Sequence, residues 1–397
     1  MEFFSTYSTN REEASAVSEV FESLSSRGLP TLLVCYYTEE YSAHRLQAEF
    51  SQQFTDVPII GCSTFQGLLT DKGFLPGAAL GVMAIYDSTD AAYGVEVSTL
   101  EHEYIQGAAT KCLQQAIQNA HRYGEQPDLI ILHSTSGYEE HAVKEIQQEF
   151  GTQVPLIGGT AADNEIIGNW SLFNQTDACQ SGIGIAVLYP SQNVSLDYHS
   201  GYTASAVSGV VTKCVDREVV EIDHKPAIDV YARWVRMITD KNLSTEELFK
   251  TSNSTPFGRL RNHTSETPQF DLIHPVKPTS CGGIQTFVTV QEGDRLHLMQ
   301  GSRERLMHRA ERVAKSARDN ATPGHRVLGA IGSFCAGSML NLGEDLDGVA
   351  KRLALSLNQR PYISPFSFGE QGCFDGESNS HANLMISAAI FYEDTNG

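Results

Sequence analysis

The chain has 397 residues and 41% of them are hydrophobic, which is enough for two or three globular domains with their own cores. Its 28 Lys and Arg residues face 48 Asp and Glu residues, and the formal net charge of −20 disfavours binding to nucleic acid or to an anionic membrane. The N-terminus shows no basic segment followed by an apolar core, no apolar run would span a bilayer, and the eight cysteines include no Cys-x-x-Cys pair. These features predict a cytoplasmic protein with reduced thiols.

The first part of the chain predicts alternating helices and strands. The expected elements are a helix over 11–26, a buried strand over 32–36, a helix over 39–53, a short strand over 57–60 and a strand over 79–86. Between the last two strands, residues 61–64 (Gly-Cys-Ser-Thr) predict a loop that leaves the sheet and presents small polar side chains to a ligand.

This order of elements recurs twice more along the chain. The second pass predicts helices over 105–121 and 138–150, strands over 129–133, 154–157 and 183–189, and a loop at Gly158. The third pass predicts helices over 302–318 and 345–358, and strands over 327–334, after Pro361 and over 385–392. Three matches predict an α/β fold built from repeated helix-strand-helix-strand-loop-strand units.

The middle of the chain, about 194–300, departs from this order and is richer in β-strand and turn signals. The expected elements are a hairpin of 206–214 with 218–222, a helix over 226–238, a loop over 251–282 and a hairpin of 285–290 with 295–299. The change places a domain boundary near 190–205, so we expect two α/β domains, residues 1–195 and 196–397, with a β-rich central segment.

Short motifs along the chain resemble those of the FIST family. The N-terminal half resembles the FIST N-terminal domain at residues 5–9, 61–64 and 158–163. The C-terminal half resembles the FIST C-terminal domain, and its matching stretches are 225–231, 292–293, 334–337, 368–370 and 381–383. The chain departs from the family pattern at Ser338, where an arginine is expected after Cys-Ala-Gly.

The resemblance implies an intracellular sensory protein that binds a small molecule. One branch, the nitric-oxide-sensing proteins called NosP, is a pair of FIST domains that binds haem and acts with a histidine kinase or a cyclic-di-GMP enzyme. This chain is similar to that branch in its length and in having no fused output domain. The resemblance therefore implies b-type haem as cofactor, one of these two enzymes as partner, and a homodimer as a candidate assembly.

The segments that follow the short strands carry the residues expected to form a ligand pocket. Hydroxyl, amide and carboxylate groups in such segments suit a small polar ligand, although Ser, Thr and Asp also cap ordinary turns. The expected pocket residues are Cys62, Ser63, Thr64, Gly158, Gly159, Thr160, Asp163, Phe368, Glu370 and Asn383. Cys62 is also a candidate nucleophile if backbone amides lower its pKa, or else a small residue packed in a tight turn.

A haem iron needs an axial ligand, usually a neutral histidine, inside an apolar slot. The chain has 13 histidines and no Cys-x-x-Cys-His motif, so haem would be bound without covalent attachment. His44 lies on the predicted helix 39–53, and His133 ends a predicted buried strand. We expect His44 to be the iron ligand, because a helix can move when nitric oxide weakens the iron–histidine bond, and His133 is the second candidate.

Three functions therefore remain open at the level of the sequence. The first is a haem-based nitric oxide sensor that regulates a partner histidine kinase or cyclic-di-GMP enzyme. The second is a sensor of another small molecule, such as an amino acid. The third is an enzyme that uses Cys62 as its nucleophile. The absorption spectrum of protein expressed with added haem separates the first function from the others.

Overall fold

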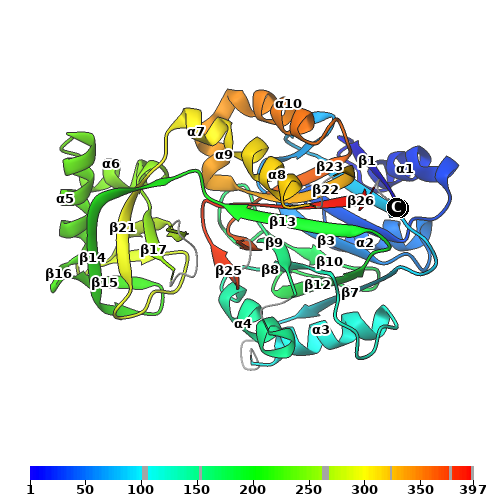
Figure 1. Ribbon diagram of the computed structural model, residues 1–397, viewed down its shortest axis with the longest axis horizontal. Helices are drawn as coiled ribbons and strands as arrows, with labels where there is room; N and C mark the ends of the chain where they lie inside the picture. Colours follow the sequence, from blue (N-terminus) through cyan, green and yellow to red (C-terminus); the bar gives the residue numbers. More distant parts are fainter. Residues whose placement is uncertain (101–105, 152–153, 262–267, 322–323, 375–377, 395–397) are drawn as a thin grey trace.

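The structure consists of a larger body and a smaller insert (Figure 1). The computed structural model describes residues 1–397 except 101–105, 152–153, 262–267, 322–323, 375–377 and 395–397. The insert comprises residues 203–300, and the body comprises the remainder. Helices cover the sheets of the body, so the predicted α/β class is confirmed. None of the helices in the described residues is both long and apolar enough to cross a membrane.

The body is built from three units that share one order of elements: strand, helix, strand, helix, strand, hairpin and strand, with two helices at each helix position of the third unit. The first unit comprises β1 (Glu2–Ser8), α1 (Glu13–Leu24), β2 (Leu32–Thr38), α2 (Ala43–Gln53), β3 (Ile59–Thr64), β4 (Gly67–Thr70), β5 (Gly73–Pro76) and β6 (Leu80–Tyr86). The second comprises β7 (Ala92–Thr99), α3 (Ala108–Asn119), β8 (Leu129–Ser134), α4 (Glu139–Phe150), β9 (Leu156–Thr160), β10 (Leu172–Phe173), β11 (Ala178–Cys179) and β12 (Gly182–Tyr189).

The third unit is interrupted by the insert. It comprises β13 (Asn193–His199) and, after the insert, α7 (Arg303–Met307), α8 (Arg309–Asp319), β22 (His325–Cys335), α9 (Ala336–Leu342), α10 (Leu346–Ser356), β23 (Tyr362–Ser367), β24 (Glu370–Cys373), β25 (Asn379–Ala382) and β26 (Ile386–Asp394). Each unit thus contains the predicted order of helices and strands, together with a leading strand and a hairpin that the sequence did not indicate.

The units are interlocked, because each lends its hairpin to the sheet of another unit. The three body sheets run β1-β6-β2-β3-β10-β11, β7-β12-β8-β9-β24-β25 and β13-β26-β22-β23-β4-β5. In each sheet the third and fourth strands are parallel, and a hairpin from a different unit pairs antiparallel with the fourth. The body therefore has an approximate threefold arrangement in which no unit completes its sheet alone.

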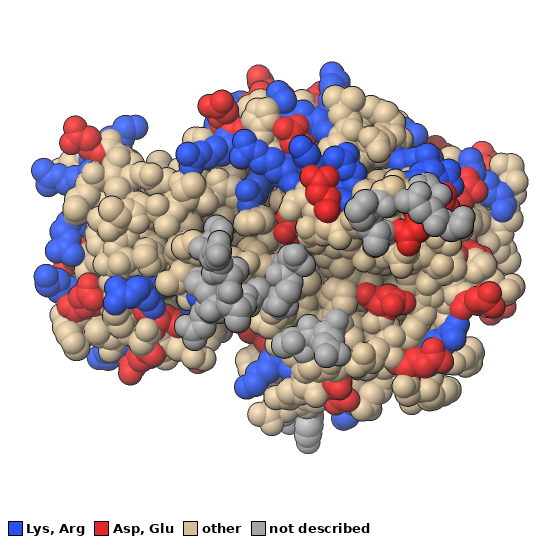
Figure 2. Space-filling view, in the orientation of Figure 1, with Lys and Arg blue, Asp and Glu red and all other residues tan. Residues whose placement is uncertain are grey.

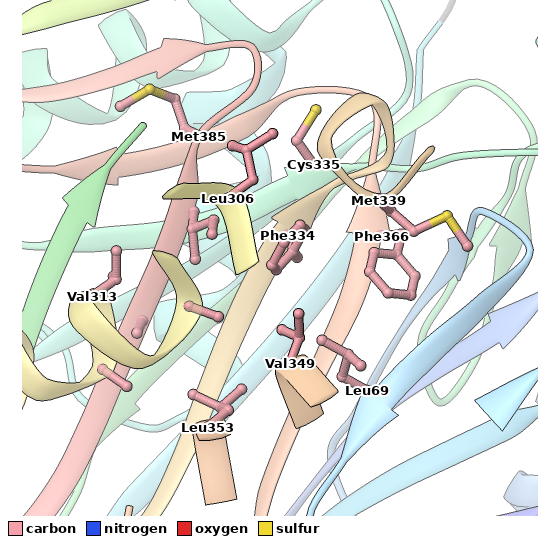
Figure 3. Close-up of a cluster of buried hydrophobic side chains, with 14 of the residues drawn as sticks. Leu69, Leu306, Val313, Phe334, Cys335, Met339, Val349, Leu353, Phe366 and Met385 are labelled. Atoms are coloured by element: carbon pink, nitrogen blue, oxygen red, sulfur yellow. The ribbon is translucent and has the colours of Figure 1, made fainter. Parts of the chain in front are cut away.

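Both faces of these sheets are buried, which explains the continuous apolar runs in the sequence. On the outer face of the third sheet, Val313 of α8, Leu353 of α10 and Phe334 of β22 belong to one cluster of buried side chains (Figure 3). The inner faces meet in a second cluster to which all three sheets contribute. This inner cluster includes Val34, Ile131 and Ile331. Sheets covered on both sides hold the ends of their strands in fixed positions.

Gly61 and Gly158 lie within strands, so the predicted loops at 61–64 and at Gly158 are wrong. A Cβ atom on Gly61 would come within 2.2 Å of the Phe173 ring, and one on Gly158 within 1.7 Å of the Leu132 carbonyl oxygen. The two glycines are therefore required for the close approach of a neighbouring segment and not for a turn.

The insert forms its own sheet, in the order β18-β17-β21-β14-β15-β20-β19, with β16 beside β15. Its elements are β14 (Thr203–Val215), β15 (Glu218–Ile222), β16 (Lys225–Pro226), α5 (Ala227–Thr239), α6 (Thr245–Lys250), β17 (Phe257–Leu260), β18 (Phe270–Ile273), β19 (Pro275–Pro278), β20 (Ile284–Thr286) and β21 (Arg295–Gln300). Tyr231 and Trp234 of α5 pack against Phe257 in its core.

Several predictions for this region need correction. The hairpin predicted for 285–290 with 295–299 is wrong, because β20 pairs with β15 and β19 while β21 pairs with β14 and β17. The loop predicted over 251–282 contains β17, β18 and β19, and its residues 262–267 lie outside the described residues. In the second unit of the body, the first residue of the predicted helix 105–121 also lies outside the described residues.

The division into domains 1–195 and 196–397 stays a prediction. Its boundary falls inside β13, which pairs with β26 along the edge of the third sheet.

The charged side chains are unevenly distributed over the face of the protein that Figure 2 shows. Figure 2 shows Lys and Arg gathered along the upper edge of the body, over α7 and α8. The exposed basic residues of these helices include Arg305, Arg312 and Lys315.

Candidate functional site

The ends of β3, β9 and β23 meet at the centre of the body, where the three units exchange backbone hydrogen bonds. The amides of Phe65, Ala162 and Phe368 donate to the carbonyls of Phe366 (2.9 Å), Ser63 (3.1 Å) and Thr160 (3.2 Å), respectively. Each of the three segments thus donates once and accepts once, and its donor lies two residues after its acceptor. The same contact therefore repeats around the approximate threefold arrangement. The segments that were expected to share a pocket are thus neighbours.

The predicted pocket residues on β3 are occupied by contacts within the protein. The Ser63 hydroxyl accepts a hydrogen bond from the Ser171 amide (3.0 Å). The Thr64 hydroxyl donates to the Gly67 carbonyl (2.7 Å) and accepts from the Phe366 amide (2.8 Å). Both side chains fix the end of β3 against neighbouring segments, so their geometry supports a structural role.

Asp163 organises the loop that follows β9. Its buried carboxylate accepts hydrogen bonds from the four consecutive backbone amides of residues 166–169, at 2.5–2.9 Å. Ile166 lies in this loop with a φ of 59°, a left-handed conformation that is strained for a β-branched residue. The carboxylate therefore holds a strained loop in place.

Thr160 links the centre of the body to the insert. Its hydroxyl donates to Glu139 (3.2 Å) and accepts from the Gln371 side-chain amide (3.3 Å). The guanidinium of Arg217, from the insert, donates to Glu139 (2.9 Å) and to Glu140 (2.6 Å), both at the start of α4. Thr160 thus belongs to a polar network that joins the insert to α4.

Cys62 and Gly159 occupy equivalent positions in β3 and β9, and both are packed. The Cys62 side chain is 2% exposed, and its thiol donates to the Ser63 carbonyl (3.5 Å). Burial raises the pKa of the Cys62 thiol, which disfavours the thiolate that a nucleophile requires. A Cβ atom on Gly159 would come within 2.5 Å of the Ser333 hydroxyl.

The two histidines proposed as haem ligands do not fit that role. His133 is buried, and its Nδ1 lies 3.0 Å from the Gly159 carbonyl oxygen while its Nε2 lies 3.3 Å from the Tyr36 hydroxyl. Burial lowers the pKa of His133 to about 4, so the ring is neutral with both nitrogens in use. His44 is exposed on α2 and borders a polar cavity that also includes Glu13 and Glu40. An apolar slot for haem is therefore missing at either position.

A more suitable cavity lies between the body and the insert. We call it the interface cavity; it has a volume of about 240 Å³ and is lined by both parts of the protein. The larger apolar side chains that line it are Phe65, Ile166, Phe249, Val276, Phe287, Leu340 and Phe368. Two of the predicted pocket residues, Phe368 and Asn383, line it. Its aromatic walls surround a few polar groups, which is typical of a small-molecule site.

The polar groups of the interface cavity are set by hydrogen bonds across the two parts. The Ser252 hydroxyl donates to the Phe249 carbonyl (2.7 Å) and lies 2.9 Å from His274 Nε2, so this nitrogen carries a proton and donates to Ser252. Burial lowers the pKa of His274 to about 4, so its ring is neutral. Asn383 of the body accepts from the His274 amide (3.2 Å) and donates to the Phe368 carbonyl (3.4 Å).

Glu370 is buried behind the wall of the interface cavity. It lies 2.8 Å from the hydroxyl of Ser367, which lines the cavity, and it accepts from the Met385 amide (2.9 Å). Burial raises the pKa of Glu370 to about 8, although these contacts favour the charged form. The carboxyl group is therefore mostly protonated at neutral pH and adds little charge to this region.

Sequence reasoning missed the insert's side of the cavity. Asn253 lies in a short 3-10 helix, and His274 and Phe287 each follow directly after a short strand; the apolar pattern there is weak, and most of that region was predicted as loop. The one signal available concerned the body's side of the cavity: the family motif at 334–337 contains Cys335 of the cavity wall.

Comparison with protein families decides the classification. The FIST N domain matches residues 31–225, and the FIST C domain matches residues 227–373. The chain belongs to the FIST family. The two matches lie end to end and together cover most of the sequence, so the resemblance seen in short motifs is confirmed at the level of both domains. FIST domains are sensory domains that bind small ligands in signal transduction.

Individual relatives of this FIST protein add little to the family match. An uncharacterized protein of Methanocaldococcus jannaschii is 22% identical over 249 residues, which is 62% of this chain. The match spans 46% of that relative, less than half its length. A crystal structure of cyanuric acid hydrolase from A. caulinodans has a TM-score of 0.36 and 8% identity, with 99% of each chain covered. Its similarity is too low to bear on the fold or the activity of this protein.

Proposed function

We propose that this FIST protein is a sensor that binds a small molecule in the interface cavity. The observation that supports it most strongly is a cavity between two parts of the protein, with aromatic walls and converging hydrogen-bonding groups. Ligand pockets usually enclose about 300–1,000 Å³. The volume of about 240 Å³ therefore favours a compact ligand. Family membership supports the sensory role.

The position of the cavity gives binding a physical route to a signal. Phe368 and Asn383 belong to the body, while His274 and Phe287 belong to the insert. A ligand that contacts both parts stabilises the arrangement in which the two walls face each other, and so shifts the population toward that arrangement. Arg217 ties the same insert to α4. A partner protein that recognises the insert or α4 would detect the shift.

Haem-based nitric oxide sensing, with a histidine kinase or a cyclic-di-GMP enzyme as partner, stays a second hypothesis. Its basis is the sequence resemblance. The apolar walls and neutral His274 ring of the interface cavity are the features that suit haem best, but the Nε2 of His274 already donates to Ser252. The small volume of the cavity also disfavours a macrocycle. Catalysis by Cys62 has no support from its buried position.

The haem hypothesis has a direct spectroscopic test. Purified protein titrated with an excess of haem is expected to show only the spectrum of unbound haem, because His44 and His133 offer no suitable ligand site. A protein-dependent Soret band that changes in His44→Ala or His133→Ala would restore those assignments. A band that survives both substitutions and is lost in His274→Ala would move haem to the interface cavity.

The ligand-binding proposal predicts a specific effect of Phe287→Ala. A library of small metabolites screened by thermal shift should contain a compound that raises the unfolding temperature of the parent protein. Truncating Phe287 removes one aromatic wall, so the Kd for that compound, measured by calorimetry, should rise about tenfold. Phe270→Ala is the control, since Phe270 is a partly buried residue of the insert that does not line the cavity. Equal losses of affinity in both variants would contradict this site.

A further inference from the structure

We infer that the ligand of the interface cavity is an uncharged molecule with an aromatic or apolar body and a hydrogen-bond donor. This inference rests on the proposed function and specifies the class of ligand. It distinguishes such a molecule from a free amino acid, which carries a carboxylate and an ammonium group at neutral pH. It also distinguishes it from anionic metabolites and nucleotides.

The first argument is the absence of charge from the cavity wall. Among the described residues that line the cavity, none is Asp, Glu, Lys or Arg. Moving an ionised carboxylate or ammonium group out of water is costly unless an opposite charge or several hydrogen bonds compensate. A zwitterion would have to bury both of its charges against apolar and neutral polar groups, so the cavity selects against it.

The titratable groups at the cavity are neutral as well. The partly buried imidazole of His274 has a pKa lowered to about 4 by desolvation, and burial raises the pKa of the Cys335 thiol. The carboxyl of Glu370, behind Ser367, has a pKa raised to about 8. At neutral pH the wall therefore presents an unprotonated imidazole, a thiol and a largely protonated carboxyl group. None of these supplies a counter-charge for a charged ligand.

The second argument is an unused hydrogen-bond acceptor. Asn253 lines the cavity, and its Oδ1 is buried without a hydrogen-bond partner in the described part of the protein. A buried oxygen without a partner costs free energy. A ligand N–H or O–H would recover it once the Asn253 side chain, whose Oδ1 is closed to solvent in this arrangement, rotates toward the cavity. The backbone carbonyl of the same residue accepts from the Tyr202 hydroxyl (2.6 Å), so the segment that carries this side chain is anchored to the body.

The third argument is the shape of the apolar walls. Phe65 and Phe368 of the body lie with ring centroids 5.9 Å apart, and the rings of Phe287 and His274 in the insert lie 5.6 Å apart. Rings contributed from both sides suit a flat aromatic ligand, which gains contact with several rings while its donor reaches Asn253. A small neutral aromatic molecule meets all three requirements.

Matched pairs of small molecules test this inference. Indole and tryptophan share a ring system, but tryptophan adds the two charged groups; 1-methylindole lacks the N–H donor. Calorimetry with the full-length protein should give a Kd for indole about tenfold or more below that for tryptophan. Indole should also bind several-fold more tightly than 1-methylindole. In Asn253→Leu the preference for indole over 1-methylindole should disappear, because the acceptor is gone.

Asn242→Leu is the matched control, since Asn242 is an exposed residue of the same insert and does not line the cavity. It should retain the preference for indole. Tighter binding of tryptophan than of indole, reduced by Phe287→Ala, would overturn the uncharged class while leaving the sensor proposal intact. Failure of indole and 1-methylindole to bind at millimolar concentration would also overturn the inference. The sensor proposal itself fails only if the metabolite screen yields no ligand that depends on Phe287.

Discussion

Asp163→Ala is expected to lower the free energy of unfolding by about 3–5 kcal/mol, because four backbone amides lose a charged acceptor at once. The Asp163 carboxylate is fully buried and receives the amides of residues 166–169. A buried amide without a partner costs about 1–3 kcal/mol, and these four hydrogen bonds are partly buried, so we expect a fraction of that cost for each. The loop also holds Ile166 in a left-handed conformation, which costs about 1–2 kcal/mol for a residue with a Cβ atom.

Graded substitutions make this result specific to the carboxylate. Three of the four amides donate to Oδ2, so Asp163→Asn can keep most of the contacts through its one carbonyl oxygen and should lose less stability than Asp163→Ala. Glu165→Ala, an exposed change in the same loop, should stay within about 0.5 kcal/mol of the parent. Urea unfolding of the three variants measures the differences. Equal stability of Asp163→Ala and Glu165→Ala would show that the amides need no carboxylate.

The threefold order of helices and strands could be predicted from the sequence because each element carries a local apolar pattern. The exchange of hairpins could not. β10 and β11 are two residues long, and the choice of β3 as their neighbour depends on contacts between units that are far apart in the chain. The roles of Gly61 and Gly158 were misjudged for the same reason. Their lack of a side chain accommodates Phe173 and Leu132, and neither contact is visible in the local sequence.

The candidate site was predicted only in part. The strand ends that carry the expected polar residues lie near one another, but Ser63, Thr64 and Asp163 are satisfied by backbone groups that a sequence does not reveal. The cavity wall depends on how the insert packs against the body. Phe368 and Asn383 could be named because they stand in family motifs, whereas Asn253 and Phe287 become neighbours of these residues only in the folded protein.

Glu370→Gln is expected to change how stability depends on pH. The folded-state pKa of Glu370 is about 8 and its ordinary value is 4.5. Between these two values the unfolded chain releases a proton that the folded protein retains, so rising pH favours unfolding. The stabilising contribution of the neutral carboxyl is complete below the ordinary pKa and is lost as the pH rises toward and through about 8. At its steepest, the loss is about 1.4 kcal/mol per pH unit.

Glutamine has the shape of the protonated glutamic acid and cannot ionise. Its amide can donate to the Ser367 hydroxyl while its carbonyl accepts from the Met385 amide, so the variant should fold like the parent. Urea unfolding across the pH range should therefore show Glu370→Gln gaining stability over the parent as the pH rises above about 5. Glu246→Gln is the control, because the side chain of Glu246 is 78% exposed in a surface pair with Lys250. If parent and Glu370→Gln lose stability in parallel from pH 5 to 8, then Glu370 is already ionised in the folded protein. The wall behind Ser367 would then carry a negative charge, and the interface cavity would favour a ligand with a positive group.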